Sequence, residues 1–224
     1  ELNKKGYEDV STVINKSLNP INIDDFNILR KQNDILILDV RPKSLFSKGH
    51  IPGSLFIGLE GMFAPWAGTL IENINQKIII VSPKGQEEEA ISRLSRVGFD
   101  NVVGFLDGGY DKWAQSSGKI KKIKCISAEE FISEASSSRI NIYDVRGEDE
   151  FKVSHFPGAK NIPLKKIDKY IGELRKKSPF YIYCKAGYRS VIASSIINKA
   201  SDFELINIEG GYDKIEKLNF STYF

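Results

Sequence analysis

The sequence FYIYCKAGYRS, residues 180–190, joins a short apolar run to the start of a helical pattern. Residues 180–183 form a continuous apolar run, which is typical of a strand buried on both faces of a parallel sheet. Apolar residues then recur at helical spacing over 191–200. The stretch therefore predicts a strand, a tight loop and a helix, with Cys184 at the end of the strand and Arg189 entering the helix.

Cys184 is a candidate nucleophile in that position. The backbone N–H groups of the loop, the positive end of the helix and the charge of Arg189 all favour the thiolate form. Gly187 can adopt a positive φ and let its amide approach one atom closely. The alternative is a buried, inert cysteine at a strand end. Because Gly187 and Arg189 stand at these offsets, we favour the nucleophile.

Composition limits the protein class. The chain has 224 residues, of which 41% are hydrophobic and 27% charged, so it can form one large or two small globular domains. The net charge of +3 is too small to indicate nucleic-acid binding, and no apolar run reaches the length of a membrane span. Cys125 and Cys184 do not form a disulfide framework, which favours a reducing, cytoplasmic location.

Strand and helix patterns alternate along the chain. Apolar runs at 35–40, 78–81 and 102–105 predict strands, and the amphipathic segment 87–97 predicts a helix. Asp24 is the expected cap of an early helix. The alternation predicts an α/β fold, a doubly wound, mostly parallel sheet with helices on both faces.

The whole pattern occurs twice. Asp-Val-Arg at 39–41 recurs at 144–146, and the turn that follows His50 recurs after His155 at the same offset. The Gly-Gly-Tyr-Asp-Lys turn at 108–112 recurs at 210–214. A repeat of this length is a whole domain. We therefore predict an arm at 1–17, a first domain at 18–117, a linker at 118–124 and a second domain at 125–224.

The repeat also serves as an internal comparison, since Ser82 stands where the second copy has Cys184. Gly85 is kept, but the position of Arg189 becomes the first of three glutamates, 87–89, which complement the helix N-terminus themselves. We expect the first domain to be chemically silent and to serve packing, partner contact or substrate entry.

The repeated motifs resemble the rhodanese family, over about 200 residues in two copies from Asn19 onward. Rhodaneses have the doubly wound fold predicted above and carry a sulfane sulfur as a persulfide on the loop cysteine. The resemblance implies that Cys184 is the catalytic nucleophile. The expected persulfide- and substrate-binding residues are the rest of the loop: Lys185, Ala186, Gly187, Tyr188, Arg189 and Ser190. The Trp usual after the second Gly-Gly turn is Ile215 here, which weakens packing there.

The expected function is transfer of sulfane sulfur from thiosulfate or a small-molecule persulfide to a thiol or cyanide, through a Cys184 persulfide. A phosphatase or arsenate reductase of the cell-cycle phosphatase type is less favoured, because such loops place five residues between Cys and Arg, and here four intervene. A loop with one residue fewer encloses a smaller space, which suits a single sulfur atom better than a tetrahedral oxyanion. A non-catalytic regulatory or docking module is the alternative from another class.

A longer architecture is also expected. Residues 3–7 and 61–69 resemble the tandem rhodanese region that follows a metallo-β-lactamase-type domain in fused persulfide-metabolising proteins. The single methionine, Met62, agrees with a chain that has lost an upstream part. Small-molecule donors and thiol acceptors are the expected partners, with no nucleic acid and no membrane. No cofactor and no metal site is expected within these residues, since His50 and His155 both belong to the repeated turn.

Several other residues are assigned structural roles. His155 survives as His50 in the copy without the cysteine, so a role in the turn is favoured. The Asp-Arg pairs 39/41 and 144/146 are expected to bond structurally, although Arg146 can also shape the mouth of the site. Cys125 is favoured as a packing residue over a resolving thiol. The basic residues of 165–177 form a solvated face or, less favoured, attract anionic donors.

Overall fold

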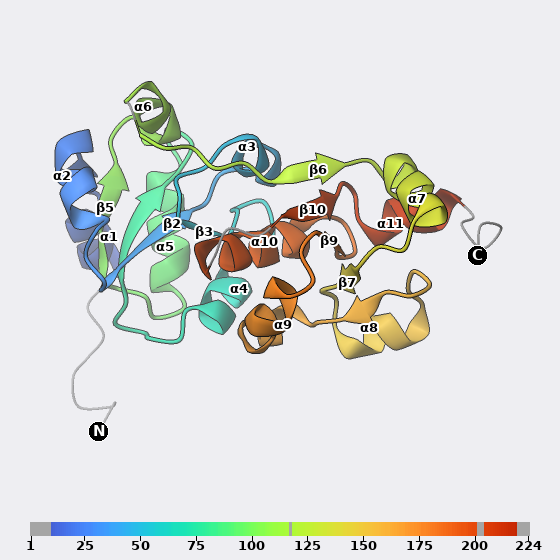
Figure 1. Ribbon diagram of the computed structural model, residues 1–224. Helices are drawn as coiled ribbons and strands as arrows, with labels where there is room; N and C mark the ends of the chain where they lie inside the picture. Colours follow the sequence, from blue (N-terminus) through green and yellow to red (C-terminus); the bar gives the residue numbers. More distant parts are fainter. Residues whose placement is uncertain (1–9, 117, 201–203, 219–224) are drawn as a thin grey trace. The chain divides into compact units, whose positions relative to one another are not determined.

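The computed structural model describes residues 10–116, 118–200 and 204–218 (Figure 1). The chain packs into two compact units. The first is Glu1–Pro42 with Ile57–Ile120, and the second is Lys43–Phe56 with Lys121–Phe224. Residues 1–9 of the predicted arm, including the 3–7 segment, lie outside the described residues. The segment 43–56 thus belongs by packing to the second unit, although it falls within the first sequence repeat.

Each repeat contains a five-stranded sheet. The first has the order β1 (Pro20–Ile21), β5 (Val102–Leu106), β4 (Lys77–Val81), β2 (Ile35–Asp39) and β3 (Leu55–Phe56). The second has the order β6 (Lys124–Ile126), β10 (Leu205–Ile208), β9 (Phe180–Tyr183), β7 (Ile142–Asp144) and β8 (Lys160–Asn161). All strand pairs of the second sheet are parallel, as are β1–β5, β4–β5 and β2–β4. The predicted α/β fold with two parallel sheets is confirmed.

Helix α1 precedes the first sheet, α2 to α5 connect its strands in turn, and α6 follows its last strand. Their bounds are α1 (Val10–Ser17), α2 (Ile23–Leu29), α3 (Lys43–Lys48), α4 (Phe63–Leu70), α5 (Glu87–Ser95) and α6 (Gly109–Gln115). The residue that caps α2 is Asn22, whose side-chain oxygen accepts the N–H groups of Asp24 and Asp25. The prediction of Asp24 as the cap is therefore wrong, because Asn22 is the last residue with extended backbone before the helix.

The helices of the second repeat cover both faces of its sheet. Their bounds are α7 (Ala128–Ser137), α8 (Glu148–Val153), η1 (Leu164–Tyr170), α9 (Ile171–Arg175), α10 (Tyr188–Ala200), α11 (Tyr212–Ile215) and η2 (Glu216–Leu218). Residues of α7 and α11 share a buried cluster with Tyr181 and Tyr183 of β9. Because side chains alternate along a strand, Ile182 faces the other side, where α10 packs on β9 and β10.

The repeated motifs make the same contacts in both copies. Arg41 donates to both carboxylate oxygens of Asp39, and Arg146 does the same to Asp144, with all four side chains almost fully buried. Each guanidinium also lies over a tyrosine ring: Arg41 is 3.9 Å from the Tyr110 centroid, and Arg146 is 4.2 Å from the Tyr212 centroid. The expected structural ion pairs are therefore present.

The two histidines also have matching surroundings. His50 stacks on Phe46 and its Nδ1 lies 3.1 Å from the Phe46 carbonyl oxygen. His155 stacks on Phe151 with its Nδ1 2.8 Å from the Phe151 carbonyl oxygen. These contacts fit the predicted role in the turn.

Two further segments bear on the predicted boundaries. Residues 10–17 of the expected arm form α1, which packs on α5 and β5, with Val13 buried. In the expected linker, Lys121 pairs with His50 in an isolated antiparallel bridge, and Ile123 is buried. Across the described ranges, no helix combines the length and apolar character needed to cross a membrane.

Candidate active site

Cys184 directly follows β9, and α10 begins four residues later at Tyr188. The loop between them folds tightly because Gly187 adopts φ +87°, a conformation that side-chain-bearing residues rarely take. This is the strand, loop and helix that the sequence predicts.

The sulfur of Cys184 lies inside the loop. Its side chain is buried, and the Gly187 backbone N–H donates to Sγ at 3.1 Å. A backbone donor aimed at the sulfur is a fixed partial positive charge at the point where a thiolate or a bound sulfur carries negative charge.

The second Gly-Gly turn is hydrogen-bonded to this loop through backbone groups. The Tyr212 N–H donates to the Cys184 carbonyl oxygen at 2.7 Å, and the Asp213 N–H donates to that of Lys185 at 3.0 Å. A Cβ atom on Gly211 would lie 2.2 Å from the Cys184 carbonyl oxygen, so only glycine fits there. The Gly-Gly-Tyr motif is thus a direct support of the loop, a role that the sequence analysis did not assign.

Arg189 is held by a carboxylate that the sequence analysis missed. Its guanidinium donates to both oxygens of Glu150 in α8, at 2.5 and 2.8 Å. The hydrogen bond from Arg189 lowers the pKa of Glu150 to about 2, and that from Glu150 raises the pKa of Arg189. Arg189 therefore stands at the start of α10 as part of an oriented ion pair, and not as an isolated cation.

The repeat contained a signal for this pair. The residue that matches Glu150 in the first copy is Leu45, and the residue that matches Arg189 is Glu87. Both partners are therefore lost together with the cysteine. Comparing the copies position by position would have identified Glu150.

The remaining predicted site residues occupy different environments. Lys185 and Ala186 are exposed, whereas Ser190 is fully buried and its hydroxyl oxygen has no hydrogen-bond partner among the described residues. The half-buried ring of Tyr188 makes an edge contact with Phe56, with 5.8 Å between the ring centroids. Arg146 donates to the Ser154 carbonyl oxygen at 2.6 Å, which places it near α8.

Lys43 is a second residue that the sequence analysis missed. It begins α3, and its Nζ donates to the Ala186 carbonyl oxygen at 2.6 Å. A Cβ atom on Gly187 would lie 3.5 Å from the same Nζ. An ammonium group thus covers the outside of the Cys184 loop within the second unit.

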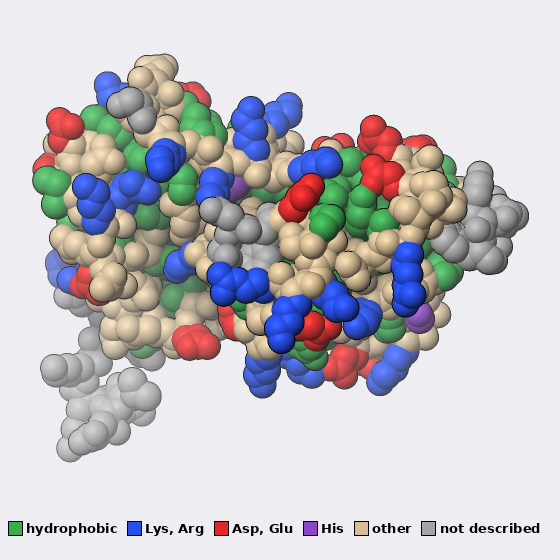
Figure 2. All heavy atoms as spheres, viewed as in Figure 1, with side chains coloured by type: hydrophobic (Ala, Val, Ile, Leu, Met, Phe, Trp, Pro, Cys, Tyr) green, Lys and Arg blue, Asp and Glu red, His purple; other side chains and the backbone are tan. Residues whose placement is uncertain are grey.

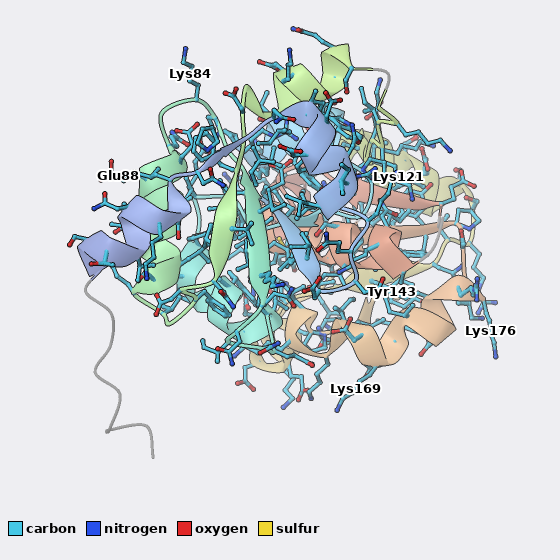
Figure 3. The ribbon with its side chains drawn as sticks, turned by 90° about the vertical axis from the view of Figure 1, so that its left-hand side faces the viewer. Lys84, Glu88, Lys121, Tyr143, Lys169 and Lys176 are labelled. Atoms are coloured by element: carbon cyan, nitrogen blue, oxygen red, sulfur yellow. The ribbon has the colours of Figure 1, made fainter. Side chains whose placement is uncertain are left out.

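The matching loop of the first unit keeps the shape but has a serine in place of the cysteine. Ser82 is buried at the end of β4, and Gly85 has φ +85°. Glu87–Glu89 form the first turn of α5, and Glu89 pairs with Arg93. Lys84 and Glu88 project outward into solvent (Figure 3).

Cys125 is too far from Cys184 for a direct disulfide. It pairs in register with Asn207, which pairs with Ile182, so two strand spacings of about 4.8 Å separate Cys125 from β9. A disulfide needs Cα atoms within about 7 Å of each other. Burial raises the pKa of the Cys125 thiol. Both observations favour the predicted packing role.

The basic residues of 165–177 lie on η1, on α9 and directly after α9, and are mostly exposed. Figure 2 shows Lys and Arg side chains gathered over this region, and Figure 3 shows Lys169 and Lys176 pointing outward. Lys166 pairs with Glu148 and Lys160 with Glu173, so acidic residues partly compensate this face.

Both halves of the chain match one family model, described as the rhodanese-like domain, over residues 23–116 and 127–218. These matches span most of the sequence. The chain therefore belongs to the rhodanese family, with two rhodanese-like domains in tandem.

Three curated relatives match over one stretch each. The uncharacterized protein YqhL of Bacillus subtilis is 35% identical over 41% of this chain and 71% of its own length. The putative sulfur carrier protein YrkF of the same organism is 35% identical over 43% of this chain, and the chain spans about half of it, 52%. The thiosulfate sulfurtransferase GlpE of Pseudoalteromonas translucida is 33% identical over 42% of this chain and 88% of its own length.

Solved structures are also similar. A rhodanese-like domain protein from Staphylococcus aureus is 28% identical, covers 42% of this chain and 91% of its own, and gives a TM-score of 0.39. SseA from Escherichia coli, described as a 3-mercaptopyruvate sulfotransferase, is 15% identical, with coverage of 88% and 99% and a TM-score of 0.40.

Proposed function

We propose that this chain is a sulfurtransferase that carries sulfane sulfur on Cys184. The observation that carries the proposal is the sulfur cradle of the second unit. There Cys184 Sγ accepts the Gly187 N–H at 3.1 Å, and the loop that encloses it leads into a helix whose second residue, Arg189, is oriented by Glu150. The relatives YrkF, a putative sulfur carrier protein, and GlpE, a thiosulfate sulfurtransferase, support the same function.

In the first half-reaction, the Cys184 thiolate attacks the sulfane sulfur of thiosulfate or of a small persulfide. A new S–S bond forms on Sγ, and the old one breaks with its electron pair leaving on sulfite or on the donor thiolate. The outer sulfur of the resulting Cys184 persulfide carries negative charge, and hydrogen-bond donors are needed to stabilise it. The loop N–H groups and the Arg189 guanidinium supply them without reorganisation, because backbone and ion pair hold them in place.

In the second half-reaction, a thiolate or cyanide attacks the outer sulfur. The Cys184–sulfur bond breaks, and its electron pair returns to Sγ. The enzyme alternates between two covalent states, so ping-pong kinetics are expected. The first domain takes no part in the chemistry, since Ser82 has no anionic form near neutral pH.

Two other functions compete with this proposal. A phosphatase or arsenate reductase would use the same nucleophile, but four residues separate Cys184 from Arg189, and the loop encloses one sulfur. A regulatory or docking module would use neither half-reaction, and the buried thiol would be incidental. The oriented Glu150–Arg189 pair, absent from the first copy, favours a chemical role for the second.

The upstream metallo-β-lactamase-type domain belongs to the same proposal. Its support is the resemblance of residues 3–7 and 61–69, of which 61–69 lead into and form most of α4. A small-molecule persulfide made or consumed by that domain would be a donor or a product of sulfur transfer at Cys184. A cytoplasmic location fits two cysteines that are both free.

The test is intact mass after incubation with thiosulfate and desalting. The wild-type chain should gain one sulfur that dithiothreitol removes, and Cys125→Ser should gain it as well. Cys184→Ser should gain none and lose turnover. A gain in Cys184→Ser equal to that of the wild type would sink the assignment, and no gain in any variant would favour the docking module.

A further inference from the structure

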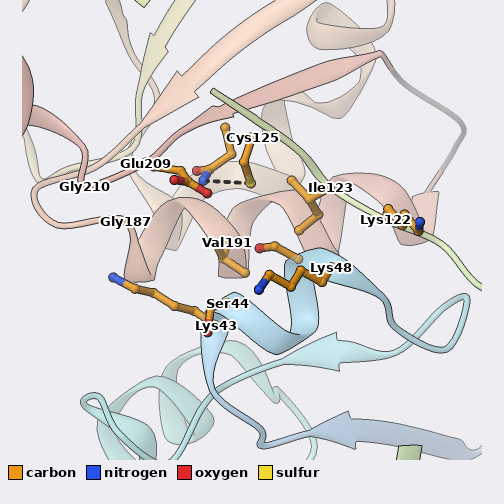
Figure 4. A pocket seen from close by; sticks show the side chains of 12 residues that line it. Lys43, Ser44, Lys48, Lys122, Ile123, Cys125, Gly187, Val191, Glu209 and Gly210 are labelled. Carbon is orange, nitrogen blue, oxygen red and sulfur yellow. Dashed lines mark hydrogen bonds between the residues drawn. The ribbon is translucent and has the colours of Figure 1, made fainter. Parts of the chain in front are cut away.

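A cavity of about 550 Å³ lies beside the Cys184 loop within the second unit (Figure 4). Side chains of α3, Val191 of α10 and Ile123 form its walls, and Gly187 and Gly210 close one end. Its volume lies in the range of small-molecule sites. Because Gly187 also donates its N–H to Cys184 Sγ, the cavity adjoins the sulfur cradle through a single residue.

The cavity is lined by more positive than negative charge. Lys43, Lys48 and Lys122 line it, against one carboxylate, Glu209. Across the residues that the structure describes, none of the three lysines pairs with a carboxylate. Figure 4 shows the Lys43 side chain extending toward the Gly187 turn and that of Lys48 lying between α3 and Val191. The field inside the cavity favours an anion.

A buried acceptor in the same lining also needs a partner. Asn207 is 3% exposed, and its side-chain nitrogen donates to Cys125 Sγ at 3.6 Å. Its Oδ1 has no hydrogen-bond partner among the described residues. An unsatisfied buried acceptor destabilises the fold, and an N–H or O–H donor from a ligand would remove that cost.

We propose that this cavity binds the sulfur acceptor of Cys184, and that this acceptor is a small organic thiol with a carboxylate and an N–H donor. The inference rests on the proposed function. Lys48, with Lys122 at the rim, attracts the carboxylate, Asn207 Oδ1 accepts the N–H, and the thiol lies at the Gly187 end.

The transfer step balances without a further reagent. The acceptor thiol gives its proton to water, and its thiolate attacks the outer sulfur of the Cys184 persulfide. The acceptor gains an S–S bond, while the Cys184–sulfur bond breaks and leaves its electron pair on Sγ. The product is the acceptor's persulfide.

The experiment compares two thiols of nearly the same shape, N-acetylcysteine and the uncharged N-acetylcysteine amide. The full chain is first loaded to completion with excess thiosulfate and desalted, so that donor binding does not enter. Discharge of the persulfide is then followed by mass for the wild type, Lys48→Glu and Lys84→Glu. Lys84→Glu is the charge-matched control, because Lys84 is an exposed residue of the first unit.

We expect Lys48→Glu to slow discharge to N-acetylcysteine by roughly five- to tenfold, because attraction of the carboxylate becomes repulsion at an exposed site. Discharge to the amide, and both rates in Lys84→Glu, should stay within about twofold of the wild type. An unchanged ratio between the two thiols in Lys48→Glu overturns the proposal.

Binding gives a readout that needs no sulfur transfer. Calorimetry with N-acetyl-S-methylcysteine should detect binding to the wild type and weaker binding to Lys48→Glu. If the wild type binds this analogue but never gains sulfur, the proposed function fails and the cavity assignment stands. If the wild type gains sulfur but does not bind the analogue, the cavity assignment fails alone.

Discussion

Both carboxylate oxygens of Glu150 accept hydrogen bonds from Arg189, at 2.5 and 2.8 Å, so that α8 orients a cation at the start of α10. The same Glu150 carboxylate also accepts the Gly147 N–H at 3.2 Å. The pair is partly exposed, with side-chain exposures of 21% for Arg189 and 38% for Glu150. Its main effect is therefore expected on geometry, with a modest effect on stability.

Glu150→Gln should make the stability of the protein less sensitive to acid. The pKa of Glu150 is about 2 in the folded chain and about 4.3 in an unfolded one. Because the folded-state value is lower, the ion pair stabilises the fold above about pH 4.3, and this contribution is lost as the pH falls toward 2. Urea unfolding at pH 7 should show a loss of about 1 kcal/mol in Glu150→Gln, shrinking at pH 3. A difference of equal size at both pH values would contradict the assigned pKa.

Arg189→Lys should keep the charge and lose the orientation. A lysine ammonium cannot make the parallel two-oxygen contact that the planar guanidinium makes with Glu150. We expect persulfide formation from thiosulfate to slow by about tenfold or more, as for loss of a preorganised donor. Arg93→Lys is the matched control, since Arg93 pairs with Glu89 on α5, the helix that follows the Ser82 loop. Equal rates in the two variants would mean that Arg189 only balances charge.

Gly187→Ala and Gly85→Ala form a matched pair, because their φ angles are +87° and +85° in the two equivalent loops. Each should lose about 1 kcal/mol of stability, the cost of a Cβ in left-handed backbone. Of the two glycines, Gly187 is the one that donates to a sulfur, so Gly187→Ala alone should slow persulfide formation beyond this loss. Thermal unfolding and single-turnover loading separate the two effects. The idea of a cradle would be wrong if Gly187→Ala loaded as fast as Gly85→Ala.

Gly211→Ala should displace the Cys184 loop, although Gly211 itself lies in the neighbouring Gly-Gly turn. Its new Cβ would lie 2.2 Å from the Cys184 carbonyl oxygen, which forces the loop or the turn to move. We expect a loss of about 2 kcal/mol and little persulfide formation. Gly109→Ala repeats the change in the first unit, with 2.9 Å to the Ser82 carbonyl oxygen. It should destabilise the protein less and leave sulfur loading intact, which mass and urea unfolding would verify.

The sequence was sufficient for the fold because its signals are local. Each signal depends on neighbouring residues, as in the apolar strands, the Gly-Gly turns and the Asp-Val-Arg motif. The repeat showed that these elements follow one another in the same order in both halves. The positions of Cys184 at the strand end and Gly187 in the turn were also predictable, since the loop is a contiguous segment whose shape follows from one strand end and one helix start.

Glu150 and Lys43 were not predicted, because each meets the loop from a distant part of the chain. Charged residues in short helices are common and carry no local mark of their partner. Only the replacement of Glu150 by Leu45 in the other copy signals its role, and Lys43 has no such signal. The same holds for the cap of α2, where Asn22 and Asp24 are both suitable residue types and only the backbone decides.

The position of Lys43 has a practical consequence for dissecting the protein. A fragment cut to residues 127–218, where the second family match lies, would omit the ammonium group that contacts the Ala186 carbonyl oxygen. It would also omit the Phe56 N–H that Ser195 accepts at 3.0 Å on α10. The half that holds Cys184 is therefore incomplete without fourteen residues encoded in the other half, and gene fragments designed from motif boundaries would yield a differently supported loop.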